Sequence, residues 1–181
     1  MNGDVVAELL DDLVAELRRA WAFTDALWLD LTDAEIRWRP TENSSAIGWH
    51  LGHQAAVAHF MVRNLLAAEP SPDPELDALM DSATAEPARS GLPHVERLAR
   101  YRAAVSERVI VRVDAIRAGG VGAPEQLPVV AAGLVRALVN HEYQHDQWIG
   151  EVRSRDLGHR LPPAPESPLL TVLDGYTILQ P

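Results

Sequence analysis

The region from residue 127 to residue 152 restricts the fold of this chain more than any other part of the sequence. Its apolar and aromatic residues recur at alternating spacings of four and three, and two histidines fall on the same pattern. The positions are Leu127, Ala131, Leu134, Leu138, His141, His145, Trp148 and Val152. This alternation is typical of the inward face of a packed α-helix. The sequence therefore predicts a helix that buries one side against neighbouring helices.

His141 and His145 occupy two positions of this face where the pattern favours apolar side chains. Their spacing of four residues stacks the two imidazoles on one side of the helix, one turn apart. Buried polar groups need partners, and a metal ion is a partner that adjacent imidazoles can share. The alternative is a pair of core histidines that are hydrogen-bonded to backbone or carboxylate groups.

Three other segments have helical periodicity: residues 4–31, residues 46–68 and residues 93–118. The helix that contains the two histidines is expected to run from residue 124 to residue 155, with Pro128 in its first turn. Four amphipathic helices of this length predict a four-helix bundle.

The connections between these helices differ in length and composition. Thr32 and Glu35 have the spacing of a capping box, which predicts a short helical turn after the first helix. Residues 69–91 are rich in proline, serine, alanine and acidic side chains, and we expect a long crossover with a short helix around residues 74–82. This length allows the third long helix to run parallel to the second.

The predicted fold is all-α: a four-helix bundle with a long crossover between helices 2 and 3 and an irregular C-terminal tail. We expect residues 1–155 to form the bundle and residues 156–181, which contain five prolines, to pack on it as the tail. The tail residues expected to contact the bundle are Leu169, Leu170, Val172 and Leu173.

The second long helix carries three histidines and two glycines. His53 shares a side of the helix with Val57 and Phe60 and is expected to point inward. His59 lies opposite His50 and is expected to be exposed or at a rim. Gly48 and Gly52, four residues apart, form a notch that we interpret as a site of close helix packing.

The amino-acid composition limits the classes of ligand and partner that the protein can bind. The chain has no cysteine, so a metal must be held by histidine and carboxylate ligands. A net charge of −10 argues against nucleic acid and anionic membranes as partners. The N-terminal residues lack the features of a signal peptide, and the 181 residues contain no apolar run long enough to span a membrane, so we expect a cytoplasmic protein.

These observations together favour a metal site inside the bundle. His141 and His145 supply two ligands, and His53 is the first candidate for the third, with His50 in reserve. Three neutral imidazoles leave a coordination position open, as in catalytic sites, and they suit zinc, nickel or iron. Side chains near the site in sequence are expected to orient the imidazoles: Glu142, Gln144 and Gln54. Arg102 interrupts the core stripe of the third helix. We expect its side chain either to form an ion pair or to extend along the apolar surface until its guanidinium reaches solvent.

Two segments carry a family resemblance. SSAIGWHLGHQAAVAHF in the second helix and LVNHEYQHDQWI in the fourth resemble the two signatures of the DinB-like superfamily of four-helix metalloproteins. Within them, GWHLGH and NHEYQH are especially similar to the metal-binding domain of ergothioneine-type sulfoxide synthases. The resemblance covers about residues 5–155.

This resemblance implies that His53, His141 and His145 are the metal ligands. It also implies a thiol-dependent transferase or isomerase that uses a low-molecular-weight thiol and a small-molecule substrate, or alternatively a non-catalytic metal-binding protein of the stress response. The sulfoxide synthases carry a second catalytic domain that this chain lacks, so we do not expect oxygen-dependent sulfoxide synthesis. The exposed apolar tail residues and the resemblance suggest a homodimer.

Overall fold

The computed structural model describes residues 3–66, 69–80, 91–120 and 126–180. The helices are α1 (Gly3–Trp28), α2 (Asp33–Arg37), α3 (Ile47–Leu66), α4 (Pro74–Met80), α5 (Val95–Arg117), α6 (Leu127–Glu151) and the π-helix η2 (Val152–Asp156), and the two strands are β1 (Leu170–Leu173) and β2 (Tyr176–Leu179). The predicted all-α bundle is confirmed.

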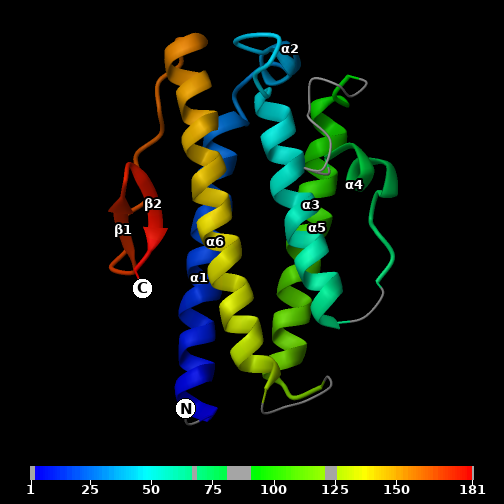
Figure 1. Cartoon of the computed structure of the whole chain (residues 1–181), viewed down its shortest axis with the longest axis vertical. Helices are drawn as coiled ribbons and strands as arrows, with labels where there is room; N and C mark the ends of the chain where they lie inside the picture. The colour runs from blue at the N-terminus through cyan, green and yellow to red at the C-terminus, as the bar shows by residue number, and fades with distance from the viewer. Residues whose placement is uncertain (1–2, 67–68, 81–90, 121–125, 181) are drawn as a thin grey trace.

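Four long helices lie side by side along the length of the molecule (Figure 1). Helices α1 and α6 run in one direction, and α3 and α5 run in the other. Residues 69–80 of the segment between α3 and α5, which include the short helix α4, lie along the outside of the bundle. Helices α3 and α5 are parallel, as the length of the crossover allows. α6 packs against both α1 and α3, so it stands where side chains from different helices can meet.

Local signals in the sequence explain several helix boundaries. Thr32 and Glu35 form the predicted capping box, in which each side chain hydrogen-bonds to the backbone N–H of the other residue. α5 ends before Gly119, whose positive φ of 68° suits glycine better than any other residue. Pro128 lies in the first turn of α6, where its missing N–H costs no helical hydrogen bond.

The core is formed by the stripes that the periodicity predicted. Fully buried side chains come from all four long helices, including Leu17 of α1, Leu51 of α3, Val109 of α5 and Leu138 of α6. Each such aliphatic side chain contributes about 1.5–3 kcal/mol by leaving water. Of the eight positions of the inward face of α6, four are buried and four partly buried. The buried ones are Ala131, Leu138, His145 and Val152, and the partly buried ones are Leu127, Leu134, His141 and Trp148.

The notch at Gly48 and Gly52 is a site of close packing, as predicted. A Cβ atom on Gly48 would lie 3.0 Å from Ile36 Cγ2. A Cβ atom on Gly52 would lie 2.6 Å from Met80 Cε and Sδ. The side chain of Met80, at the end of α4, therefore rests directly on the backbone of α3.

The C-terminal segment is more ordered than expected. Residues 170–179 form an antiparallel hairpin, β1–β2, in which Leu170 is paired with Leu179. Val172 and Leu173, which were predicted to contact the bundle, are 69% and 58% exposed. Leu179 is the buried residue of the hairpin instead, and its backbone N–H donates to Asn140 Oδ1 of α6 over 2.8 Å. Leu169 and Leu170, the other two residues predicted to contact the bundle, are partly buried against the core. The hairpin thus attaches mainly through β2 and the first residue of β1, while the end of β1 faces solvent.

Among the residues that the structure describes, no helix combines the length and the apolar character that crossing a bilayer requires.

Candidate metal centre

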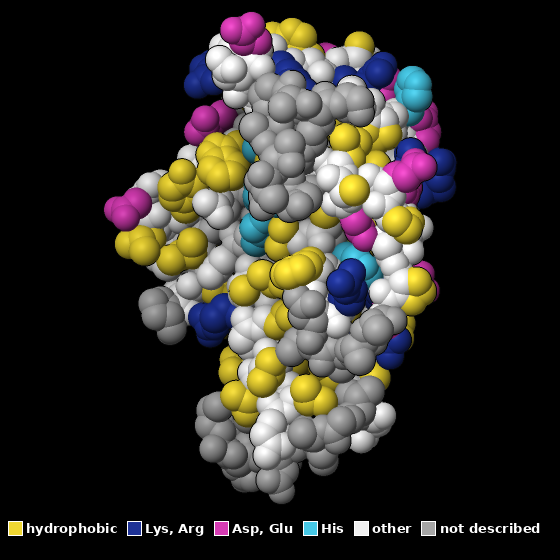
Figure 2. Space-filling view, turned by 45° about the vertical axis from the view of Figure 1, so that its right-hand side comes forward, with side chains coloured by type: hydrophobic (Ala, Val, Ile, Leu, Met, Phe, Trp, Pro, Cys, Tyr) yellow, Lys and Arg dark blue, Asp and Glu magenta, His cyan; other side chains and the backbone are white. Residues whose placement is uncertain are grey.

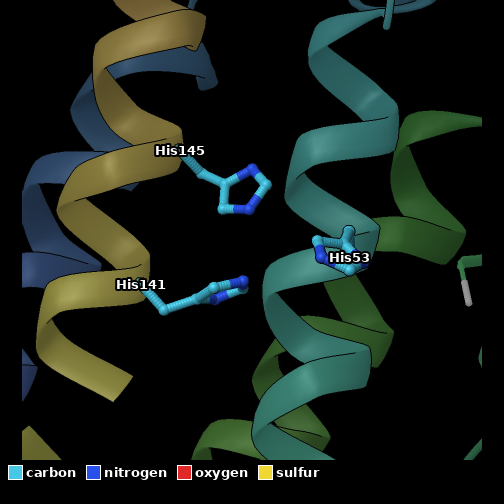
Figure 3. Close-up of side chains that lie close together, drawn as sticks. All are labelled: His53, His141 and His145. Carbon is cyan, nitrogen blue, oxygen red and sulfur yellow. The ribbon is translucent and has the colours of Figure 1, made fainter. Parts of the chain in front are cut away.

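Helices α3 and α6 bring three histidines together in the interior of the bundle. His53 projects from α3 toward His141 and His145, which project from consecutive turns of α6 (Figure 3). One ring nitrogen of each histidine lies within 4.8 Å of the others. This is the residue set that the sequence favoured, and the distances are those of a group that can hold a metal ion.

The nitrogen separations can be compared with those of a tetrahedral site. Nitrogens bound to zinc at about 2.1 Å lie about 3.4 Å apart in a tetrahedron. Separations of up to 4.8 Å would have to shorten by up to about 1.4 Å, which rotations about the side-chain bonds of the imidazoles can supply. Three imidazoles then leave a fourth position for another ligand.

The electrostatic state of the cluster suits a metal. Burial lowers the pKa of His141 to about 4, with the neighbouring His53 adding to the effect. Burial, followed by His141 and His50, lowers the pKa of His145 to about 2. The imidazoles of His141 and His145 are therefore neutral at physiological pH and need lose no proton to coordinate a cation. Nδ1 of His141 is buried without a hydrogen-bond partner in the described structure, which is a cost that a bound ion removes.

The orientation of His53 is fixed from two sides. Its Nδ1 lies 2.9 Å from the backbone oxygen of Met80. Since a carbonyl oxygen only accepts, Nδ1 is the protonated nitrogen and Nε2 is left for a ligand. The indole ring of Trp49 stacks on the imidazole at 4.6 Å with an interplanar angle of 8°. A backbone carbonyl that holds the second nitrogen is a common way of orienting a metal-binding histidine.

His50 supports the cluster from behind His145. Its Nδ1 lies 2.8 Å from Nδ1 of His145, so one of the two rings donates and the other accepts. Burial lowers the pKa of His50 to about 3, and the pair is therefore neutral. An Nδ1 occupied in this way leaves Nε2 of His145 for a metal. The rings of Trp49 and Trp148 pack against His50 on this side of the cluster.

Glu142, Gln144 and Gln54 were expected to orient the imidazoles, and their positions correct that expectation. Gln144 is exposed. Gln54 and Glu142 direct their hydrogen bonds into a separate buried cluster with Arg102, Thr24 and Asp146. On a helix, the side chains of residues adjacent in sequence point about 100° apart. The side chain of Glu142 therefore points toward other residues than that of His141 does.

This second polar cluster also explains why an arginine, Arg102, lies on the core face of α5. Its guanidinium donates to Gln54 Oε1 and to the backbone oxygen of Leu51, and it lies 3.6 Å from Glu142 Oε2. Burial raises the pKa of Glu142, and burial together with the charge of Glu142 raises that of Asp146 well above its usual range. The predicted ion pair of Arg102 is therefore present, and it lies in the core.

His59 was predicted at an exposed rim, and this was wrong: it is only 3% exposed. Its ring lies between Asp77 of α4, 3.7 Å from Nε2, and Arg108 of α5, 3.3 Å from Nδ1. The crossover covers the side of α3 that helical geometry alone assigned to solvent.

Two features of the site were missed from the sequence. The Met80 carbonyl that orients His53 is a backbone group, so no side-chain pattern identifies it. The contact between His59 and Asp77 joins two elements through the crossover, and an isolated histidine and aspartate in different segments carry no signal of their proximity.

Comparison with known families agrees with this architecture. The family model of the DinB superfamily matches residues 16–149, about three quarters of the 181 residues. The chain belongs to the DinB superfamily. No match to a curated protein was found.

The DinB match begins within α1 and ends near the end of α6, so it includes all four helices of the bundle. His53, His141 and His145 all lie inside it. The C-terminal hairpin lies outside it. The grouped histidines are thus part of the DinB bundle itself.

Proposed function

We propose that this DinB protein is a divalent-metal-dependent enzyme that acts with a small thiol, as a transferase or an isomerase, through an open site formed by His53, His141 and His145. The observation that carries the metal is the convergence of three histidines, two buried and one partly buried, one of them with an unsatisfied Nδ1. Metal binding is frequent in the DinB superfamily, which supports the same reading. The thiol rests on the resemblance of GWHLGH and NHEYQH to sulfoxide synthases.

The protein's own groups prepare the site. Met80 and Trp49 hold the ring of His53, and the carbonyl of Met80 engages its Nδ1, which leaves Nε2 as the nitrogen that can bind a metal. When Nε2 of His145 binds a metal, its Nδ1 carries the proton and donates it to Nδ1 of His50, so His50 favours the tautomer that coordination needs. The aromatic ring of Trp148 meets His145 edge-on at 5.0 Å and packs against its imidazole. A divalent cation bound to the three imidazoles would supply a Lewis acid that lowers the pKa of a coordinated thiol.

The first test measures metal. We expect the purified protein to contain about one equivalent of a divalent metal by mass spectrometry, and we expect His141→Ala to lose most of it. His94→Ala is the matched control, because His94 is exposed and lies outside the cluster. Absence of metal in the wild type, or unchanged content in His141→Ala, would falsify the proposal.

The second test separates turnover from simple binding. In the Co²⁺-substituted protein, a thiol that reaches the open position should produce a sulfur-to-cobalt charge-transfer absorption. A protein that binds Co²⁺ but does not respond to any thiol would instead be a metal-binding module without turnover, for which a role in the stress response is the alternative.

A further inference from the structure

A cavity of about 410 Å³ lies between α3 and α4. Its volume is that of a site for a small organic molecule. Its wall is apolar at Val57, Phe60 and Met80 and polar at His59, Arg63 and Asp77. On this face of the molecule a histidine, a basic and an acidic side chain lie close together among hydrophobic ones (Figure 2). The cavity thus combines an apolar surface with a small group of polar atoms.

The first polar atom is a buried nitrogen of His59. Its Nδ1 lies 3.3 Å from Arg108 Nη1, and since a guanidinium only donates, Nδ1 accepts and Nε2 carries the proton. Burial lowers the pKa of His59, which keeps the ring neutral. Nε2 has no hydrogen-bond partner among the described residues. A buried N–H without an acceptor is costly, so this group favours a ligand oxygen in the cavity.

The second polar atom is a carboxylate oxygen on α4. Asp77 Oδ1 accepts a hydrogen bond from Tyr101 Oη, and Asp77 Oδ2 lies 3.7 Å from His59 Nε2. This separation is too long for a direct hydrogen bond. It is short enough for one oxygen to lie about 2.8 Å from both atoms. Such an oxygen would accept from His59 and donate to Asp77.

These two atoms together favour a hydroxyl group over an ion. A carboxylate ligand could accept from His59, but it would lie against the negative charge of Asp77. An ammonium ligand could donate to Asp77, but its N–H groups would meet the N–H of His59. A hydroxyl accepts and donates through the same oxygen. Among the described residues that line the cavity, the charged side chains are Arg63 and Asp77, which have opposite signs, so no excess charge attracts an ion.

We propose that this cavity binds a small neutral alcohol whose hydroxyl lies between His59 Nε2 and Asp77 Oδ2. The apolar body of the alcohol packs against the apolar wall, which includes Phe60. His53 also lines the cavity, but His59 and Asp77 are not among the three candidate metal ligands. The proposal therefore goes beyond the proposed function and does not depend on the metal.

The test compares four small aromatic ligands that differ in their polar group: benzyl alcohol, benzyl methyl ether, benzylammonium and benzoate. NMR titrations that follow the imidazole resonances of His59 locate the site and give each affinity. The ether accepts a hydrogen bond but cannot donate one. We expect the alcohol to bind about tenfold more tightly than the ether, as one hydrogen bond to a charged acceptor allows. Both ions should bind more weakly than the alcohol.

Two substitutions remove one partner each, and ligand-observed NMR measures their effects. Asp77→Ala should reduce the affinity for the alcohol to that for the ether, because the acceptor of the hydroxyl proton is gone. His59→Phe should weaken the binding of both ligands, since both use the same N–H. Glu75→Ala is the matched control, because Glu75 lies on the same helix as Asp77 but is 84% exposed and outside the cavity. It should leave all four affinities unchanged.

The wild-type protein decides the proposal even if a substitution prevents folding. Equal affinities for the alcohol and the ether, or no saturable shift of the His59 resonances with benzyl alcohol, would show that His59 and Asp77 hold only a water molecule. Either result would overturn the proposal, as would tighter binding of either ion than of the alcohol.

Discussion

A single hydrogen bond connects His50 to the candidate ligand His145. The two Nδ1 atoms lie 2.8 Å apart in a buried site. In the metal-bound protein, with Nε2 of His145 on the metal, its Nδ1 is the donor, so loss of His50 leaves that proton without an acceptor. We expect His50→Phe to weaken zinc binding about 10- to 100-fold, as for other residues that orient a ligand. His50→Asn, whose amide oxygen can accept the same proton, should recover part of the loss. The measurement is a competition titration with a chelator of known affinity.

His94→Asn is the control for this prediction, since its side chain is 74% exposed and it contacts Asp33 rather than the cluster. If His50→Phe binds zinc as tightly as the wild type, the orienting role of His50 is wrong even though the contact exists.

The low pKa of His141 makes the stability of the metal-free protein depend on pH. The pKa is 6.5 in the unfolded chain and about 4 in the folded protein. Between these values the unfolded chain binds a proton that the folded protein does not, so the free energy of unfolding rises with pH. The contribution of neutral His141 to the free energy of unfolding is fully present above pH 6.5 and is lost as the pH falls toward 4. One proton corresponds to about 1.4 kcal/mol per pH unit.

We therefore expect the free energy of unfolding to rise less steeply with pH in His141→Gln than in the wild type between pH 4 and 6.5. The difference in slope should be up to about 1.4 kcal/mol per pH unit, which corresponds to one proton. Glu142 and Asp146, whose pKa values are raised by burial, act in the opposite direction, but they are present in both proteins and cancel in the comparison. Urea unfolding of chelator-treated protein at several pH values gives the slopes. Equal slopes would show that His141 is protonated alike in the folded and unfolded states.

The sequence identified part of the site for a physical reason. His141 and His145 were recognised because polar residues on an inward helical face require a partner. The relation of His50 and His53 remained open, since both can face the interior within the error of a helical projection. The structure separates them: His53 joins the other two ligand nitrogens, and His50 contacts His145 from outside the group.

The packing of α4 on α3 depends on the absence of a side chain at Gly52. A Cβ atom there would lie 2.6 Å from Met80 Sδ and 2.8 Å from its Cγ, so Met80 must move. We expect Gly52→Ala to cost about 1–3 kcal/mol of unfolding free energy, the usual range for overpacking. The loss should be smaller in a Met80→Ala background, where the clash is absent. Denaturant unfolding measures both.

Gly133→Ala is the matched control for this substitution. Gly133 lies within α6, and nothing is within 4 Å of an added Cβ atom. Alanine has the higher helix propensity, so this change should stabilise the protein by about 0.5–1 kcal/mol. If Gly52→Ala also stabilises the protein, the contact between α3 and α4 is looser than the structure indicates.

The long helices could be predicted from the sequence, whereas the short C-terminal hairpin was not. Periodicity identified the long helices because each buries one stripe over several turns. The hairpin was missed because its strands are only four residues long, and proline in the tail suggested irregular structure. Asp174 and Gly175, both with positive φ, form its turn. An Asp-Gly pair between apolar runs is a known hairpin signal that the sequence did contain.

Arg102 joins the bundle into one unit through the buried cluster at its centre. It lies on α5, binds Gln54 and the Leu51 carbonyl of α3, and faces Glu142 of α6. Thr24 of α1 then lies 3.2 Å from Glu142 Oε2 and 2.8 Å from Asp146 Oδ1. All four long helices therefore meet in one polar network. The sequence predicted an ion pair for Arg102 but not its partners, which come from other helices.

Removing the cation should destabilise the whole molecule. Arg102→Met leaves Glu142 buried without its positive partner, and such losses typically cost about 3–5 kcal/mol. Glu142→Gln in the same background removes the unpaired charge and should restore part of the stability, so the double-mutant cycle should give a favourable coupling energy of about 1–3 kcal/mol. Arg97→Met is the control, because its ion pairs with Asp73 and Glu75 lie at the surface and should contribute less than about 1 kcal/mol. If Arg102→Met costs no more than Arg97→Met in denaturant unfolding, the network does not hold the four helices together, and the apolar stripes alone carry the stability of the bundle.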